Sequence, residues 1–290
     1  MITIENTHLR LTIAEEGAEM KSLVELATQR EILWQGDEEF WNGTAPILFP
    51  NTGRYWQGCF RHQGKQFEQS LHGFVRHRLW TTSRQEADMA VLIYESTADD
   101  LSVYPFPFRL QVTYTLKERE VLVDFKVENL GEEEMLFQIG GHPGFNVRTY
   151  EDDLDNYGMV RIEGKAKHIL RAGEGGCMEA DHYEIPVMED GFIPVTVETF
   201  ANEALIFEEH DVDFVSLFDS KHRPIVAVKC PSPATLIWVP QGQKAPFVCV
   251  EPWWGLPDSI GFNGELSERR YMQSARKGMP WKGGFSFVVF

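Results

Sequence analysis

A regular alternation of apolar and polar residues is the feature that most constrains the fold of this chain. In residues 108–116 (FRLQVTYTL) every second side chain is apolar, and residues 120–129 (EVLVDFKVEN) repeat the pattern after a short polar connection. Successive side chains of a β-strand point to opposite faces of the sheet. This period of two therefore predicts an antiparallel hairpin with one buried face.

Short apolar or alternating runs recur along the whole chain, separated by turns rich in glycine, proline and asparagine. They lie at residues 8–13, 89–96, 134–141, 159–166, 204–209, 214–218, 225–229, 235–239, 247–251 and 285–290. Amphipathic stretches with a helical period are short and sparse. This pattern predicts an all-β protein built as a large antiparallel β-sandwich. Because no linker or repeat period interrupts the chain, residues 1–290 are expected to form one domain.

The charge balance limits the partners of the chain. Its 290 residues include 27 basic and 44 acidic side chains, so the formal net charge is 27 − 44 = −17. Such a chain repels phosphate backbones and anionic membrane surfaces, and we expect neither nucleic acid nor membrane as a partner. No run approaches the roughly 20 apolar residues that span a bilayer, and no signal peptide is evident, so a cytoplasmic location is expected. The four cysteines show no CxxC spacing, which indicates neither a zinc knuckle nor a disulfide framework.

Two segments combine a charged residue with aromatic neighbours. Arg54 in the segment 45–56 (APILFPNTGRYW) offers a planar fork of donors suited to vicinal hydroxyls or a carboxylate, or it stacks on its aromatic neighbours at the surface. Glu251 in the segment 246–258 (PFVCVEPWWGLPD) ends a buried-looking strand beside two tryptophans. A carboxyl group in such surroundings has a raised pKa that suits acid or base catalysis, unless an arginine pairs with it.

Two histidines lie in comparable segments. His72 belongs to the segment 71–80 (LHGFVRHRLW), and His142 lies among glycines in the segment 137–147 (FQIGGHPGFNV). Glycines let the backbone approach a ligand closely, and an imidazole exchanges protons near neutral pH. Either residue is alternatively a structural histidine. His72 and His77 are five positions apart, on opposite sides of a strand, which argues against a shared metal.

The other aromatic and imidazole side chains considered are expected to have structural roles or to lie at the surface. Trp34 and Trp41 are expected to pack in the core. The histidines without a surrounding motif are expected to be surface or structural residues; they are His8, His62, His168, His182, His210 and His222. Together, the singled-out residues suggest a site for an uncharged polyol without metal or phosphate machinery.

Four stretches, FPNTGR, HGFVR, GGHPGFN and VEPWWGLPD, occur in this order and resemble the aldose 1-epimerase (galactose mutarotase) family, most closely its LacX-like branch. The similarity runs over nearly the whole chain. It implies the galactose mutarotase-like fold, a large antiparallel β-sandwich called a supersandwich. It also implies an isomerase that interconverts the α and β anomers of a free aldohexose with neither cofactor nor metal.

The resemblance also implies roles for individual residues. Glu251 matches the base that takes the proton from the anomeric hydroxyl, and His142 matches the acid that protonates the ring oxygen. His72 and Arg54 match residues that bind the sugar. The family usually adds an aspartate that binds sugar hydroxyls, and the region 208–218 (EEHDVDFVSLF) offers Asp211 and Asp213 for this role. We choose Asp213 because it directly precedes the apolar part of a strand.

Three alternatives stay open at this point. A hexose-phosphate mutarotase would use clustered basic side chains, here Arg54, Arg76, His77 and Arg78. A non-catalytic carbohydrate-binding protein would bind sugar without accelerating mutarotation. A glycoside hydrolase would need a second carboxylate about 5 to 10 Å from Glu251, for which Asp213 and Asp258 are candidates. The preferred sugar and the choice between monomer and homodimer are not determined by the sequence.

Overall fold

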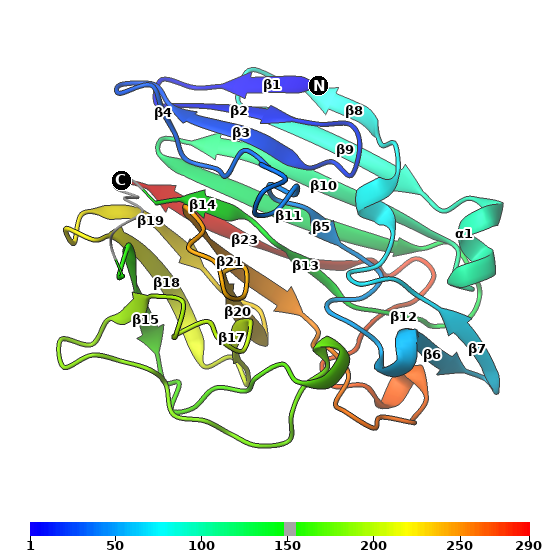
Figure 1. Cartoon of the computed structure of the whole chain (residues 1–290). Helices are drawn as coiled ribbons and strands as arrows, with labels where there is room; N and C mark the ends of the chain where they lie inside the picture. Colours follow the sequence, from blue (N-terminus) through cyan, green and yellow to red (C-terminus); the bar gives the residue numbers. More distant parts are fainter. Residues whose placement is uncertain (148–154) are drawn as a thin grey trace.

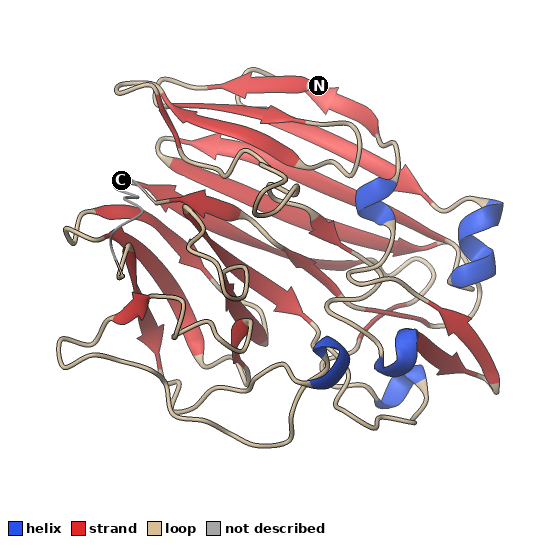
Figure 2. Ribbon diagram, in the orientation of Figure 1, coloured by secondary structure: helices blue, strands red, loops and turns tan. Residues whose placement is uncertain are grey.

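The computed structural model describes residues 1–147 and 155–290, and it consists mainly of antiparallel β-strands (Figures 1 and 2). The predicted all-β architecture with large antiparallel sheets is therefore confirmed. Helical structure in the described residues is limited to one short α-helix, α1 (Ala98–Val103), and four single 3₁₀ turns. None of the helices in this part of the chain has the length and apolar character needed to cross a membrane.

The largest sheet has nine strands in the order β16-β15-β18-β19-β23-β11-β10-β9-β8. Its strands are β8 (Thr81–Gln85), β9 (Met89–Glu95), β10 (Phe108–Lys117), β11 (Glu120–Asn129), β15 (Gly158–Gly164), β16 (Ile193–Val195), β18 (Val212–Asp219), β19 (Pro224–Lys229) and β23 (Trp281–Val289). The hairpin predicted from the alternation is β10 and β11, which pair from Phe108↔Asn129 to Lys117↔Glu120. The C-terminal strand β23 pairs with both β11 and β19, so it joins strands from the two halves of the chain.

A second sheet carries the candidate site. Its path runs β17-β20-β21-β13-β5, and β14 also pairs with β21. The strands are β5 (Ile47–Leu48), β13 (Ile139–Gly141), β14 (Gly144–Asn146), β17 (Ala204–Phe207), β20 (Ala234–Trp238) and β21 (Phe247–Trp254). This sheet packs on the nine-stranded one, with Phe145 against Phe287 and Trp254 against Phe125. All eight residues of β21 are buried, since one face meets this layer and the other meets the site.

Smaller sheets complete the molecule. The N-terminal sheet contains β1 (Ile2–Glu5), β2 (Leu9–Ile13), β3 (Met20–Glu25) and β4 (Arg30–Glu31). β6 (Cys59–His62) and β7 (Lys65–Glu68) form a two-stranded hairpin, and β12 (Met135–Phe137) pairs with the distant β22 (Gln273–Ala275) in another two-stranded sheet. Alternate residues of the long strands are fully buried, as the period of two predicts, and their side chains form one extensive apolar core between the layers.

Candidate active site

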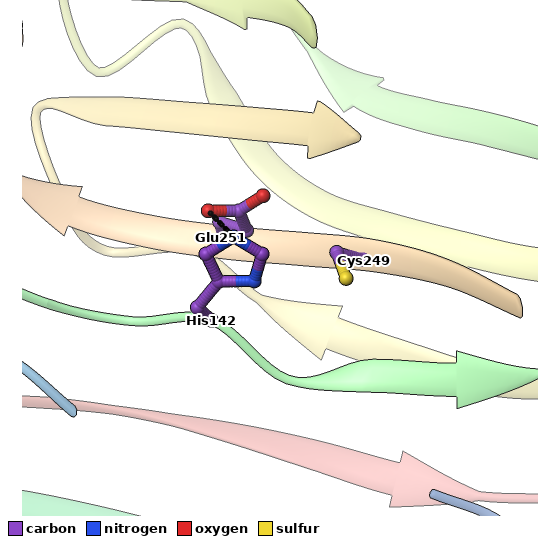
Figure 3. Close-up of side chains that lie close together, drawn as sticks. All are labelled: His142, Cys249 and Glu251. Carbon is purple, nitrogen blue, oxygen red and sulfur yellow. Dashed lines mark ion pairs between the residues drawn. The ribbon is translucent and has the colours of Figure 1, made fainter. Parts of the chain in front are cut away.

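The register of β21 brings His142 and Glu251 together. The short strands β13 and β14 both pair with β21, through Gly140↔Trp253 and Gly144↔Cys249. Going from Gly140 to Gly144 along one segment corresponds to going from Trp253 back to Cys249 along β21, so no residue is inserted or skipped between the two pairs. His142, midway between the glycines, therefore lies opposite Glu251, midway between Trp253 and Cys249. Figure 3 shows the two side chains facing each other, with His142 Nε2 3.2 Å from Glu251 Oε2.

The glycines before His142 are needed for close packing. A Cβ atom on Gly140 would lie 2.6 Å from the indole Cδ1 of Trp253, and one on Gly141 would lie 2.5 Å from the ring of Phe285. Only a residue without a side chain leaves room at both positions. The segment is thereby held against β21, and the His142 amide donates a hydrogen bond to the Pro46 carbonyl at 3.1 Å.

His142 and Glu251 lie at the wall of a cavity of about 640 Å³, a volume typical of small-molecule sites. Its aromatic walls are Trp41, Trp238 and Trp253, and its apolar residues include Leu71, Ile206 and Leu236. The other polar side chains that line it are Arg54, His72, Arg76 and Glu203. Aromatic faces with a few polar groups of both charges are suited to a polyhydroxylated ring.

Burial dominates the electrostatics of the facing pair. Loss of hydration raises the pKa of Glu251 well above its ordinary range, while the neighbouring Trp253 acts in the opposite direction. Loss of hydration also lowers the pKa of His142 to about 3, and the charge of Arg76 contributes in the same direction. Both shifts disfavour charge, so they favour the state in which the two groups hold one proton between them. Such a pair can accept one proton and deliver another without a net change in charge.

Aromatic contacts fix the orientation of His142. Its ring stacks on Trp41, with centroids 4.8 Å apart, and meets the edges of Trp238 and His72. The indole Nε1 of Trp253 is buried and makes no well-aligned hydrogen bond with the described residues. A buried donor of this kind is costly unless a ligand accepts from it.

His72 presents a defined donor to the cavity. The Gly53 amide donates to His72 Nδ1 at 3.0 Å, which assigns the proton of the neutral ring to Nε2. Burial, supported by the positive charges of its surroundings, lowers the pKa of His72 well below its ordinary value and keeps the ring neutral. Both His72 and Gly73 have positive φ, and a Cβ atom on Gly73 would lie 2.1 Å from the Phe49 carbonyl oxygen. This tight turn sets the position of His72.

Two guanidinium groups reach the same cavity. Arg54 lines it from the loop after β5. Arg76 donates to the Leu71 carbonyl at 3.0 Å, while its buried Nε makes no hydrogen bond with the described residues. Of the four basic residues expected around a phosphate, Arg78 does not contribute here, because it pairs with the buried Asp100 at 2.7 Å. His77 is likewise absent from the residues that line the cavity.

The loop that carries Arg54 is anchored by a buried ion pair that the sequence did not reveal. Asp258 accepts from the Trp56 amide at 2.8 Å and from Arg269 Nε at 2.5 Å. The Arg269 guanidinium also lies 4.1 Å from the centre of the Tyr55 ring. Asp258, considered above as a second hydrolytic carboxylate, is therefore occupied by Arg269 and does not line the cavity.

The structure brings Glu251, His142, His72 and Arg54 together, but not Asp213. Asp213 is exposed on β18 of the nine-stranded sheet and lines a different cavity, beside Lys229. The alternative, Asp211, pairs with Lys165 at 3.2 Å. Asp213 was chosen because it precedes an apolar strand. That strand, β18, belongs to the nine-stranded sheet and not to the sheet that carries the candidate site.

Sequence reasoning missed Glu203 and misplaced Trp41. Glu203 lies in the turn before β17, with a positive φ, and like Glu251 it is an acidic side chain that lines the cavity. An acidic residue directly before the apolar run 204–207 was the available signal. Trp34 is buried in the core as expected, whereas Trp41 forms part of the cavity wall.

A thiol lies beside the facing pair, and the three groups together have the composition of a metal site. The ligand atoms of His142, Cys249 and Glu251 lie within 4.8 Å of one another (Figure 3). Burial raises the pKa of the Cys249 thiol well above its ordinary value, and the nearby Glu251 adds to the shift. Because metals bind the thiolate, a thiol held in its protonated form is a weak ligand.

The chain is similar to proteins of one family. The family model described as aldose 1-epimerase matches residues 1–260. The chromosomal protein LacX of Lactococcus lactis subsp. lactis is 29% identical over 268 residues, which cover 89% of each chain. A galactose mutarotase-like protein from Lactobacillus casei is 31% identical, with a TM-score of 0.92 and complete coverage of both chains. A galactose mutarotase related enzyme from Lactobacillus acidophilus is 28% identical, with a TM-score of 0.90 and coverage of 100% of this chain and 97% of the other.

Proposed function

The chain belongs to the aldose 1-epimerase family, and from this premise we propose that it interconverts the α and β anomers of a free aldohexose. Family membership confirms the predicted resemblance and makes the protein an isomerase of the mutarotase type. The observation that carries the proposal is the 3.2 Å approach of His142 and Glu251 in a cavity walled by tryptophans.

Mutarotation requires two proton transfers on opposite sides of one carbon atom. A base removes the proton from the anomeric O1, an acid delivers one to the ring O5, and the C1–O5 bond breaks to give the open-chain aldehyde. Rotation about C1–C2 exposes the other carbonyl face. Ring closure then reverses both transfers and gives the opposite anomer. The sum of the steps consumes no proton and needs no oxidant.

The shared proton of the pair suits this sequence. The neutral arrangement, Glu251 carboxylic acid with His142 imidazole, contains the same number of protons as Glu251 carboxylate with His142 imidazolium. A sugar that donates from O1 to Glu251 and accepts at O5 from His142 favours the second arrangement. In the proposed reaction Glu251 is the base and His142 is the acid during ring opening, and their roles reverse during ring closure, so each turnover restores the starting pair.

The remaining polar residues of the cavity are proposed to hold the sugar. The Nε2–H of His72 donates to a ring or hydroxyl oxygen, and Arg54 offers further donors. Glu203 replaces Asp213 in our proposal as the carboxylate that accepts from sugar hydroxyls. The tryptophan faces match the apolar faces of a pyranose ring.

One observation supports a second candidate, a hexose-phosphate mutarotase. Arg54 and Arg76 line the same cavity, and the Arg76 Nε is a buried donor without a partner in the described residues. Two guanidinium groups can hold a phosphate. A higher kcat/KM for glucose 6-phosphate than for every free aldose tested would favour this candidate.

Polarimetry tests the proposal directly. Freshly dissolved α-glucose and α-galactose are followed with and without protein, at a pH where spontaneous mutarotation is slow. Acceleration is expected, and Glu251→Gln should reduce kcat by at least about 100-fold, because it removes the general base. Sugar binding without acceleration would instead indicate a carbohydrate-binding protein, and full activity of a folded Glu251→Gln variant would refute the assigned base.

A further inference from the structure

Two histidines and a glutamate form a cluster outside the proposed catalytic pair. They are His168, His182 and Glu208, and their ligand atoms all lie within 4.8 Å of one another. The imidazole rings of His168 and His182 are in direct contact, with centroids 4.0 Å apart. His182 Nε2 lies 3.7 Å from Glu208 Oε1. From the sequence alone, both histidines are expected to be surface or structural residues without a surrounding motif.

Three adjacent backbone segments bring the cluster together. Ile169 exchanges two backbone hydrogen bonds with Tyr183, each 2.9 Å long. On its other side, the same segment pairs with β17 through Leu170 and Ile206. His168, His182 and Glu208 each lie one or two residues from these pairs, so the sheet geometry, and not flexible side-chain reach alone, holds them close.

The carboxylate of Glu208 is already oriented. Its Oε2 accepts from Arg270, and the Tyr271 hydroxyl lies 3.4 Å from the same oxygen. Its Oε1 faces His182. In metal sites, a carboxylate that binds the metal through one oxygen commonly accepts hydrogen bonds at its other oxygen. These bonds fix the direction in which the metal-binding oxygen points.

These observations point to a cation of a particular kind. Two imidazoles and one carboxylate suit zinc and similar divalent transition metals, and they are unlike the all-oxygen sites of calcium or magnesium. Ligand atoms of a tetrahedral zinc site lie about 3.4 Å apart, so small side-chain rotations close the cluster. The His182 side chain is 52% exposed, which lets the ion enter from solvent and lets water complete its coordination.

We propose that His168, His182 and Glu208 bind one divalent transition-metal ion, with zinc as the type case, and that this ion clamps a wall of the cavity. The two histidines stand at opposite ends of the segment 168–182. Ala172, Gly173, Gly175 and Gly176 of this segment line the cavity, and a Cβ atom on Gly176 would lie 3.1 Å from Arg54 Cδ. A metal ion bound to both histidines and to Glu208 would link both ends of the segment 168–182 to the end of β17. The proposal does not depend on the reaction that the cavity performs.

Calorimetric titration of ZnCl₂ into protein stripped with EDTA and then dialysed tests the site. One equivalent is expected to bind, and His182→Gln and His168→Gln should each weaken the affinity by more than about 100-fold, since each removes a direct ligand. His8→Gln removes an exposed histidine from the turn between β1 and β2 and should leave the affinity unchanged. His142→Asn should also leave it unchanged, which separates this site from the facing pair.

Trypsin supplies a readout of the clamp. Arg171 lies inside the segment 168–182 and is a cleavage site, so Zn²⁺ should slow cleavage after it in the wild type but not in His182→Gln. Absence of zinc binding, or stoichiometric binding that His182→Gln and His168→Gln leave unchanged, would overturn the proposed site. Zinc binding at this site with no change in cleavage after Arg171 would overturn the clamp.

Discussion

The imidazole of His142 faces the carboxylate of Glu251 because Gly140 and Gly144, on either side of His142, pair with the same strand in one register. The two residues are far apart in the sequence, yet Nε2 and Oε2 approach to 3.2 Å. Burial shifts both groups toward their neutral forms, and in that state the pair has a single proton to share. The proposed catalytic behaviour follows from this relationship.

The first prediction concerns the pH dependence of activity. A histidine with an ordinary pKa near 6.5 would produce an inflection in that region, but the His142 pKa is lowered to about 3 and the Glu251 pKa is raised. Both shifts favour the one-proton state of the pair, so kcat/KM should show no inflection near pH 6.5 in a series measured between about pH 5.5 and 7.5. Polarimetric kcat/KM values across this range check the expectation. An inflection near pH 6.5 that disappears in His72→Asn would assign the titration to His72 instead.

The second prediction concerns Glu203. If its carboxylate accepts hydrogen bonds from the sugar, Glu203→Gln should raise KM by about 10-fold and change kcat little, because ground-state and transition-state binding are weakened alike. Glu209→Gln is the matched control, since Glu209 is an exposed glutamate beyond the other end of β17 and is not among the residues that line the cavity. Equal KM values for the wild type and Glu203→Gln would remove Glu203 from the proposed site.

The third prediction concerns stability in acid. The His72 pKa in the folded protein lies well below its value of about 6.5 in the unfolded chain, so unfolding takes up a proton below that pH. The stability that depends on neutral His72 is complete above pH 6.5 and is lost as the pH falls. Relative to His72→Asn, the wild type should lose about 1.4 kcal/mol of unfolding free energy per pH unit below pH 6.

Urea titrations of both proteins between pH 7.5 and 5 measure this difference. Asparagine is the chosen substitution because it tolerates the positive φ of position 72. Parallel pH profiles for the two proteins would show that His72 does not titrate differently in the folded and unfolded states.

The fourth prediction concerns the turn that positions His72. Gly73 and Gly64 have similar φ angles of 70° and 74°, but only Gly73 is crowded, by the Phe49 carbonyl oxygen. Gly64→Ala should therefore cost about 1 kcal/mol from backbone strain alone, and Gly73→Ala should cost about 1 to 3 kcal/mol more. Chemical unfolding measures both variants. Gly73→Ala should also lower kcat/KM, since it displaces His72, whereas Gly64→Ala should not.

Most of the architecture could be predicted from local patterns. The alternation in residues 108–129 predicted the hairpin of β10 and β11, because burial of one sheet face imposes a period of two on the sequence. The chain order of strands and turns likewise favoured a large antiparallel sandwich. The pairing of β23 with both β11 and β19 links strands from the two halves of the chain, a long-range contact that no local pattern could establish. The single domain over residues 1–290 stays a prediction.

The candidate site was likewise predictable only in part from local sequence. Glu251, His142, His72 and Arg54 were singled out from residue type, neighbours and the family resemblance, and the structure places all four at one cavity. Asp213 was chosen without knowing that its strand belongs to the nine-stranded sheet, and Glu203 carried too weak a local signal to be chosen. The roles of these residues stay predictions until the variants are measured.

By itself, the sequence determined the strands, their buried faces and the family to which the chain belongs, because these depend on side-chain periodicity and short motifs. Only the tertiary structure decided which side chains meet: that Arg78 pairs with Asp100, that Trp41 stacks on His142, and that His168 lies against His182. Such contacts depend on pairing between distant strands, and the free energy of that pairing is spread over many buried residues. No short segment of the sequence contains that information.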